Sequence, residues 1–248
     1  MPLSAVIIAK NAAAQLEDCL RSARFADELV VVDSGSTDGT PEIAARCGAR
    51  VLQKEWLGFG PQKQFAVEAA RHDWVLCLDA DERVSPELAQ SIAEELRTPR
   101  AKVYALARCN RFLGRWLRHG EGYPDWCVRL FDRSHARWSA DVVHEKVVTQ
   151  SPVLRLSGDL MHDSAETLEK YLDKQNRYTS LQAADLRAAG RHATVLHLAL
   201  SPVLRFVKFY VLRLGFLDGT PGLVHIAIGC MNSFNKYAKL MALERAGR

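Results

Sequence analysis

The sequence predicts an α/β fold with a mostly parallel sheet and flanking helices, followed by a helical C-terminal extension. Two observations lead to this prediction. In the first hundred residues, strand-like apolar runs alternate with helix-like segments over short connections, which is typical of βαβ units. After residue 164 the pattern is helical almost to the end, so we expect two domains, 1–163 and 164–248.

Each element of this fold has its own signal. Apolar runs predict strands of the parallel sheet at 3–9, 29–32 and 74–78, and 49–52 is a candidate for a further strand. The spacing of apolar residues and capping signals predict helices after them: 16–23, 40–46, 62–70 and 85–97. Thr40 and Pro41 are the expected N-cap and first helical residue of the second helix. Residues 102–158 change to short β-rich pieces separated by Gly, Pro and Asp.

Length and composition fit one large globular domain, or one domain with an appendage. The chain is 48% hydrophobic and 25% charged, and its net charge of +4 gives no reason to expect a nucleic-acid partner. Its six cysteines are scattered without a C-x-x-C pair. We therefore expect a reduced cytoplasmic protein without a disulfide framework or a zinc site. Because the first strand begins at Leu3, we expect no signal peptide.

Acidic turns follow two of the predicted strands. Asp33 comes directly after three valines, and Asp79 and Asp81 follow the run that ends at Leu78. Open α/β sheets bind ligands just beyond the carboxyl ends of their strands. Carboxylate oxygens at that edge suit Mg²⁺ or Mn²⁺, which bridges substrate phosphates and keeps several waters. The two turns predict an enzyme that handles a nucleotide–metal complex.

Both turns also have a structural interpretation. Ser, Gly and Asp are common in strand-to-helix loops because they tolerate unusual dihedrals and cap helices. This explains Ser36 and Thr37 better than Asp33, since an unpaired carboxylate directly after three valines would be costly. Asp79-Ala80-Asp81, with Glu82 as another solvated charge, is by itself equally well explained as a surface turn. Neither turn has the spacing of a G-x-G-x-x-G motif or a Walker P-loop.

Several motifs then occur in the order of a known family. Val-Asp-Ser-Gly-Ser-Thr-Asp-Gly-Thr at 32–40 and Leu-Asp-Ala-Asp-Glu at 78–82 resemble glycosyltransferase family 2, which implies a Rossmann-like GT-A fold. Within that family, four later motifs are similar to the lipopolysaccharide inner-core glucosyltransferases of Gram-negative bacteria: Pro61-Gln62-Lys63-Gln64, Tyr123-Pro124-Asp125-Trp126, Arg129-Leu130-Phe131 and Val143-His144-Glu145. The resemblance covers residues 3–165, and the helical tail also fits this subgroup.

The resemblance implies roles for residues at the strand ends. Asp33 and Ala9 would line the pocket of the nucleotide base or ribose, and Asp79 would hold the ribose or a metal-bound water. Asp81 would bind the metal on the diphosphate, and Mg²⁺ or Mn²⁺ is the expected cofactor. The glutamate that the family often carries after the first strand is missing, because alanine follows Asn11.

Three further residues are candidates for contacts to the donor or the metal. Lys63 and Arg129 would place positive charge near a diphosphate. A lysine at the start of an amphipathic helix is equally often only solvated, and Arg129 is also spaced to pair with Asp125. Some GT-A enzymes use a late histidine as a metal ligand, which makes His162 a candidate, although a lone histidine is more often structural.

Inverting glycosyl transfer needs a carboxylate that accepts the proton of the acceptor hydroxyl. Family members commonly place this base in a Glu-Asp motif after the Asp-x-Asp strand. Here Pro124 precedes Asp125, so Asp125 is the candidate catalytic base, with a simple turn carboxylate as the alternative. The remaining candidates for acceptor or sugar contact have an equally good structural interpretation: Trp116, Tyr123, Trp126 and His144-Glu145.

The tail carries a separate signal. Between residues 187 and 245 basic residues outnumber acidic ones, and within 203–214 the three cations Arg205, Lys208 and Arg213 fall on one side of a helix. We do not expect a transmembrane span, because Pro202 and these cations interrupt the apolar stretch. A basic amphipathic helix on the inner-membrane surface is the expectation, and packing on the catalytic domain or on a second subunit, as in a homodimer, is the alternative.

The predicted function is metal-dependent, inverting transfer of a hexose from a nucleotide sugar, with UDP-glucose as the expected donor, to a lipopolysaccharide core acceptor. Two alternatives remain. A sugar-nucleotide nucleotidyltransferase should carry a glycine- and basic-rich loop near its N-terminus, and residues 10–14 contain no glycine. The presence of Asp79, Asp81 and a candidate base argues against the other alternative, a non-catalytic nucleotide-sugar-binding protein.

Overall fold

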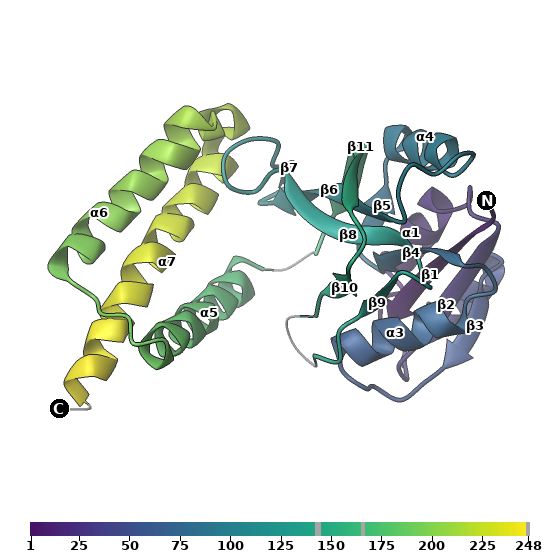
Figure 1. Cartoon of the computed structure of the whole chain (residues 1–248), viewed down its shortest axis with the longest axis horizontal. Coiled ribbons are helices and arrows are strands. Elements are labelled where there is room, and N and C mark those ends of the chain that lie inside the picture. Colours follow the sequence, from purple (N-terminus) through teal and green to yellow (C-terminus); the bar gives the residue numbers. More distant parts are fainter. Residues whose placement is uncertain (142–144, 165–166, 247–248) are drawn as a thin grey trace. The chain divides into compact units, whose positions relative to one another are not determined.

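The structure is a computed structural model that describes residues 1–141, 145–164 and 167–246. It divides into two compact units (Figure 1). The first comprises Met1–Cys109 and Asp125–Asp163, and the second comprises Asn110–Pro124 and Ser164–Arg248. The expected domains 1–163 and 164–248 differ from these units in the segment 110–124, which belongs to the second unit.

The first four strands of the first unit form the parallel half of its main sheet. Their order is β3-β2-β1-β4, and their bounds are β1 (Leu3–Ala9), β2 (Glu28–Asp33), β3 (Arg50–Gln53) and β4 (Trp74–Asp79). In the register of these strands, Ala9 lies beside Asp33 and Ile8 beside Asp79. The strand ends that carry the acidic turns therefore meet at one edge of the sheet, as expected for parallel strands.

The β-rich middle of the chain supplies the antiparallel half. The sheet continues from β4 in the order β8-β6-β11-β5. The bounds of these strands are β5 (Glu82–Val84), β6 (Val103–Phe112), β8 (Asp125–Asp132) and β11 (Val153–His162). Three short strands complete the described strands: β7 (Arg115–Trp116) beside β6, and β9 (Ala136–Trp138) paired with β10 (Val147–Thr149). The result is a mixed sheet whose parallel half was predicted from the apolar runs.

Helices cover this sheet, and alternate residues of its strands face two hydrophobic cores. The helices are α1 (Leu16–Ser22), α2 (Thr40–Arg46), α3 (Phe59–Ala69) and α4 (Pro86–Glu95). On β1, Ile7 packs in one core cluster with residues of α1 and α4, whereas Val6 packs in the other with residues of α3. Burial on both faces explains why β1, β2 and β4 are mostly apolar runs.

The start of α2 differs from the expectation in one detail. Gly39, and not Thr40, occupies the N-cap position. The Thr40 hydroxyl is used elsewhere, because it accepts a hydrogen bond from the backbone N–H of Ala12 at 2.8 Å and donates to Asp38. The residue therefore joins the loop after β1 to the loop after β2 instead of capping the helix.

The second unit is helical. It contains α5 (Leu168–Ala188), α6 (Val195–Phe206), the π-helix η1 (Val207–Leu212), the short 3₁₀-helix η2 (Gly215–Asp218) and α7 (Gly219–Ala246). The long helix α7 packs against both α5 and α6 (Figure 1). The segment 110–124 is fixed to these helices by Asp218, whose carboxylate accepts the backbone N–H groups of Arg118 and His119 at 3.0 and 2.8 Å. These bonds explain why 110–124 belongs to this unit.

Candidate active site

A cavity of about 510 Å³ opens at the carboxyl ends of β1 and β4. Four residues singled out from the sequence line it: Ala9, Asp79, Asp81 and His162. The rest of the lining comes from the strand ends, the loop after β1 and the approach to α3: Ile8, Lys10, Asn11, Ala12, Gln15, Trp56, Phe59 and Ala80. The cavity lies where an open α/β sheet binds ligands, just beyond the ends of its parallel strands.

The carboxylate of Asp79 is held between two buried cations. Lys63 Nζ lies 2.9 Å from Asp79 Oδ1, and Arg129 Nη2 lies 2.7 Å from Oδ2. Each of the two cationic side chains is only 5% exposed. Burial raises the pKa of Asp79, but the charges of Arg129 and Lys63 outweigh burial and hold this pKa well below its usual range. Asp79 is therefore a fixed anion at the wall of the cavity.

Further ion pairs continue this arrangement on both sides. Lys63 Nζ also lies 2.9 Å from Glu145 Oε1, and Arg129 Nη2 lies 2.8 Å from Glu82 Oε1. Glu82 is fully buried, and its carboxylate accepts the backbone N–H of Asp79 at 3.0 Å. The interpretations of Glu82 and Lys63 as solvated charges are therefore wrong, because both side chains are buried and paired. Charged side chains that are buried to this extent must be paired to be stable.

Asp125 is connected to this group of ion pairs through Arg108. It is paired in register with Arg108 of β6. Its Oδ2 accepts two hydrogen bonds from Arg108, at 2.9 Å from Nε and 2.6 Å from Nη2. Arg108 Nη1 lies 3.7 Å from Glu82 Oε1. The sequence analysis considered Arg129 as the partner of Asp125, but Arg108 has this position. Arg129 pairs with Asp79 and Glu82 instead.

Asp81 and His162 form a second polar pair at the cavity. His162 ends β11, and its Nε2 lies 3.4 Å from Asp81 Oδ2. The backbone carbonyl of Asp81 accepts the N–H of Asp163 at 3.0 Å, which ties the turn after β4 to the end of β11. A carboxylate and an imidazole at this distance fit two ligands of one divalent cation. Among the described residues, no group of three or more His, Cys, Asp or Glu side chains forms a metal cluster.

Asp33 lies beside Ala9 in the sheet but is not among the lining residues of the cavity, where the resemblance had implied it would be. It is fully buried, and its Oδ2 accepts the backbone N–H groups of Gly35 and Ser36 at 3.1 and 3.0 Å. The same turn is joined to the loop after β1, because Asn11 Oδ1 accepts the N–H of Thr37 at 2.8 Å. Asp33 therefore shapes the turn that borders the cavity, through hydrogen bonds that compensate its burial.

The sequence analysis missed two exposed aromatic side chains of the cavity. Trp56 and Phe59 are 43% and 46% exposed, and their ring centroids lie 4.9 Å apart in a T-shaped arrangement. The signal was present as Trp-Leu-Gly-Phe directly before the helix that carries Lys63. Large apolar groups in a loop at a cavity mouth are available for a ligand, since they bury little surface within the chain.

The aromatic candidates of the sequence analysis lie elsewhere. Trp116 and Tyr123 belong to the second unit. Trp126 lies on β8, where the guanidinium of Arg155 is 4.6 Å from its ring centroid. Of the pair His144-Glu145, His144 lies outside the described residues, and Glu145 contacts Lys63 as described above.

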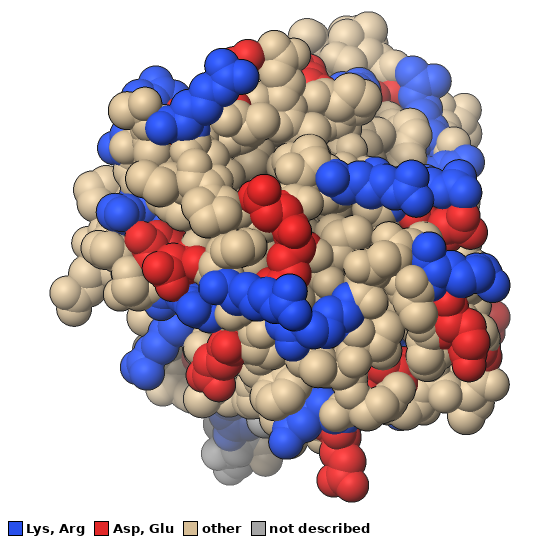
Figure 2. Space-filling view, turned by 90° about the vertical axis from the view of Figure 1, so that its right-hand side faces the viewer, with Lys and Arg blue, Asp and Glu red and all other residues tan. Residues whose placement is uncertain are grey.

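Surface charge on the first unit is mixed. Figure 2 shows Lys and Arg side chains interspersed with Asp and Glu across the face in view, without a continuous field of either sign. A nucleic-acid-binding face would carry a basic patch or stripe instead. The face in view therefore offers no support for such a partner.

Comparison with known proteins shows the family of this chain. Residues 4–151 match Glycosyl transferase family 2. The chain is 32% identical to an uncharacterized glycosyltransferase of Rickettsia bellii, over 98% of this chain and 87% of the relative. It is 29% identical to the lipopolysaccharide core biosynthesis glycosyltransferase LpsC of Rhizobium meliloti, over 97% and 92%.

Among solved structures, glucosyl-3-phosphoglycerate synthase from Mycobacterium tuberculosis in complex with Mn²⁺ and UDP-glucose matches with a TM-score of 0.38 and 27% identity. That match covers 44% of each chain. The family match spans most of the first unit, including the strands and acidic turns that form the cavity, and the relatives extend it over nearly the whole length. The chain belongs to glycosyl transferase family 2.

Proposed function

We propose that this protein is an inverting, metal-dependent hexosyltransferase that uses a nucleotide diphosphate sugar and a lipopolysaccharide core acceptor. One observation carries the proposal: Asp79, Asp81 and His162 line a single cavity at the ends of the parallel strands. Behind them, Lys63 and Arg129 fix the carboxylate of Asp79. This combination of fixed anions at an open site suits a ligand that carries both hydroxyl groups and a metal-bound diphosphate.

In this proposal the carboxylate of Asp79 accepts hydrogen bonds from the nucleotide sugar. Lys63 and Arg129 are less available to the nucleotide sugar, because each already has anionic partners. The low pKa of Asp79 keeps it an acceptor throughout the physiological range. A ribose hydroxyl or a metal-bound water would donate the hydrogen bond to Asp79. Ala9 and the neighbouring backbone form the wall next to it, and Asp33 holds the adjoining turn.

Asp81 and His162 would hold the divalent cation, Mg²⁺ or Mn²⁺. Their 3.4 Å separation fits two ligands of one ion, and the open cavity leaves the other positions to diphosphate oxygens and water. When bound, such an ion neutralises charge on a leaving diphosphate. Asp79 is the weaker ligand in this arrangement, because its two oxygens are engaged by Lys63 and Arg129.

Asp125 is the proposed base for the acceptor hydroxyl. Both hydrogen bonds from Arg108 fall on Oδ2, which leaves Oδ1 available to accept a proton, and the side chain is 41% exposed. Inversion requires one such carboxylate on the acceptor side. A transfer product of the wild-type protein with retained anomeric configuration would exclude this role.

UDP-glucose is the proposed donor, as the sequence resemblance to inner-core glucosyltransferases implies. The acceptor class rests on the same resemblance and on the relative named as a lipopolysaccharide core biosynthesis glycosyltransferase, which matches over nearly the whole chain. A core acceptor would be a sugar on a lipid anchor, so the proposed place of action is the cytoplasmic face of the inner membrane.

A donor screen tests the proposal. Purified protein is incubated with Mg²⁺ or Mn²⁺ and a panel of nucleotide sugars, and released nucleoside diphosphate is measured with and without a core-oligosaccharide acceptor. Release from one donor that depends on metal and is stimulated by the acceptor supports the transferase and names its sugar. Nucleotide binding without release across the panel supports the non-catalytic alternative. Release of pyrophosphate from a nucleoside triphosphate and a sugar phosphate would support a nucleotidyltransferase.

A further inference from the structure

An exposed apolar stripe runs along α6 and η1 in the second unit. Its members recur at three- and four-residue spacing and are each at least 43% exposed: Leu196, Leu200, Val203, Val207 and Val211. The segment Val195–Leu212 has a mean hydropathy of 1.5, and within the described chain it is long and apolar enough to cross a membrane. None of it is buried. A stripe of this size on a soluble surface marks an interaction site.

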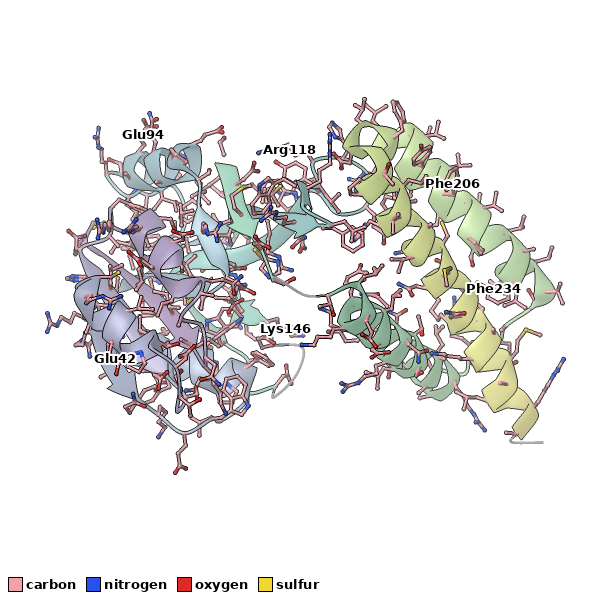
Figure 3. The ribbon with its side chains drawn as sticks, turned by 180° about the vertical axis from the view of Figure 1, so that it is seen from behind. Glu42, Glu94, Arg118, Lys146, Phe206 and Phe234 are labelled. Atoms are coloured by element: carbon pink, nitrogen blue, oxygen red, sulfur yellow. The ribbon has the colours of Figure 1, made fainter. Side chains whose placement is uncertain are left out.

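The other side of the same segment is polar and is used within the unit. The ring of His197 is stacked on Tyr237 of α7, with 4.8 Å between ring centroids. Arg205 Nη1 lies 3.0 Å from Ser233 Oγ of α7, and Arg205 also forms an ion pair with Glu121. A membrane-spanning helix would bring these groups into hydrocarbon, whereas a helix lying in the interface keeps them on its protein side. In Figure 3, α6 and α7 lie side by side, with Phe206 labelled on α6 and Phe234 on α7.

The charged groups of Arg205, Lys208 and Arg213 gather on one side of the segment, as expected from the sequence. They lie 5.7, 5.1 and 5.9 Å from the ring centroid of Phe209. Arg205 faces α7 and Glu121, whereas Lys208 and Arg213 are exposed next to the stripe. The two exposed cations can therefore extend from the edge of the stripe toward headgroups while their stems cover apolar surface.

Charge complementarity identifies the partner. Residues 191–243 contain six lysines and arginines and one acidic residue, Asp218. Asp218 is 2% exposed and its carboxylate is occupied by the backbone of 118–119, so it does not offset the exposed cations. An apolar stripe bordered by Lys and Arg, without an exposed carboxylate, matches the acyl and headgroup layers of an anionic bilayer. A second copy of this chain would oppose the same cations to each other.

We propose that α6 and η1 lie in the plane of an anionic membrane, with the stripe inserted below the headgroups and Lys208 and Arg213 at their level. The helix α7 is the support that holds this segment parallel to the surface. The inference does not depend on the proposed transfer reaction, because it rests on residues of the second unit alone.

Flotation of the full-length protein with vesicles tests the proposal. Phosphatidylcholine vesicles with about one-third phosphatidylglycerol are compared with pure phosphatidylcholine vesicles, without nucleotide sugar or acceptor. We expect binding to the anionic vesicles that weakens with salt, and a loss of about tenfold or more in Leu200→Gln/Val207→Gln. Leu181→Gln on α5 is the matched control, because Leu181 and Leu200 are both 51% exposed. Lys208→Gln/Arg213→Gln should weaken binding to anionic vesicles and leave binding to neutral vesicles unchanged.

Three results would overturn the inference. The first is wild-type protein that does not float with anionic vesicles. The second is a dimer in sedimentation that Leu200→Gln dissociates while vesicle binding persists, which would assign the stripe to a second copy. The third is a loss of thermal stability in Leu200→Gln well beyond that in Leu181→Gln, which would show that the chain itself covers the stripe. Vesicle binding with the expected variant pattern supports it whether or not the donor screen detects transfer.

Discussion

Lys63 Nζ lies 2.9 Å from Asp79 Oδ1, and this contact joins the first turns of α3 to the carboxyl end of β4. Asp79 lines the cavity, whereas Lys63 does not. Because Lys63 also contacts Glu145, one buried ammonium organises two carboxylates. The position of Asp79 therefore depends on a charge that does not itself line the cavity.

Lys63→Met should destabilise the protein by about 2 to 3 kcal/mol. Removing one partner of a buried ion pair leaves the other uncompensated, and here Arg129 still compensates part of the charge of Asp79. The free energy of unfolding in urea measures the change. Lys102→Met is the matched control, because Lys102 pairs with Asp132 while remaining 47% exposed, and its loss should cost about 1 kcal/mol or less. Equal losses in the two variants would mean that the Lys63 contacts contribute no more than a surface pair.

Asp81→Asn should remove the dependence of nucleotide binding on Mn²⁺. If Asp81 and His162 hold the ion, the wild-type protein binds UDP about tenfold or more tightly with Mn²⁺ than without it, and the variant shows no such difference. Calorimetric titration with UDP, with and without Mn²⁺, measures the two affinities. His162→Gln should reduce the effect of Mn²⁺ on UDP binding less than Asp81→Asn does. Asp18→Asn serves as the control, since Asp18 is an exposed partner of Arg83. A full Mn²⁺ effect in Asp81→Asn would place the ion elsewhere.

The meeting of Ala9, Asp33 and Asp79 at one sheet edge could be predicted from sequence. Continuous apolar runs identify buried strands, and the carboxyl ends of parallel strands share an edge, so the residue after each run has a known place. The turn chemistry of Asp33 was underestimated, because its carboxylate accepts the N–H groups of Gly35 and Ser36, two and three residues further on.

The contacts of Asp125 could not be predicted in the same way. They depend on the register of the antiparallel strands β6 and β8, which sets Arg108 beside Asp125 across a loop that belongs to the second unit. A shift of one residue would turn every side chain of a strand to the other face, and no local pattern fixes it. The burial of Glu82 could not be predicted for the same reason. It depends on the antiparallel pairing of β5 with β11 at the end of the sheet.

Trp56→Ala should weaken ligand binding in the cavity by about fivefold to tenfold, because an exposed ring at a cavity wall offers a stacking surface worth about 1 kcal/mol or more. The readout is the KM for the donor and for the acceptor, measured separately, which identifies the ligand that meets the ring. Leu57→Ala is a close control, since Leu57 is 42% exposed and is not a lining residue of this cavity. Unchanged KM values for both substrates would exclude Trp56 from the binding site.

The stability of the protein should fall as the pH drops from about 6.5 to about 4, through His225. Burial, reinforced by the charge of Arg205, lowers the pKa of His225 from 6.5 to about 4, against the opposite effect of Asp218. The unfolded chain therefore takes up a proton in this range that the folded chain does not, so stability increases with pH there and the full contribution is present above about 6.5. The contribution is up to about 3 kcal/mol.

Urea unfolding at about pH 7 and about pH 5 measures this effect of His225. His225→Gln should reduce the difference between the two conditions, because glutamine does not titrate. The control variant His192→Gln should retain it, since the His192 side chain is 83% exposed. The same pH dependence in wild type and His225→Gln would show that other groups cause it.

Asp125→Asn should lower kcat by about a hundredfold or more while leaving nucleotide binding within about twofold, since a general base contributes on this scale and Asp125 does not line the donor cavity. Asparagine keeps an oxygen for Arg108 but cannot accept the proton. Glu145→Gln is the informative comparison, because Glu145 is a partly exposed carboxylate that shares Lys63 with Asp79. If Glu145 only holds Lys63 in place, Glu145→Gln should lower the free energy of unfolding and reduce kcat modestly. A collapse of kcat in Glu145→Gln, with Asp125→Asn active, would transfer the role of base to Glu145. Opposite configuration of product and donor at the anomeric carbon is required in either case, because each assignment has one carboxylate acting on the acceptor side.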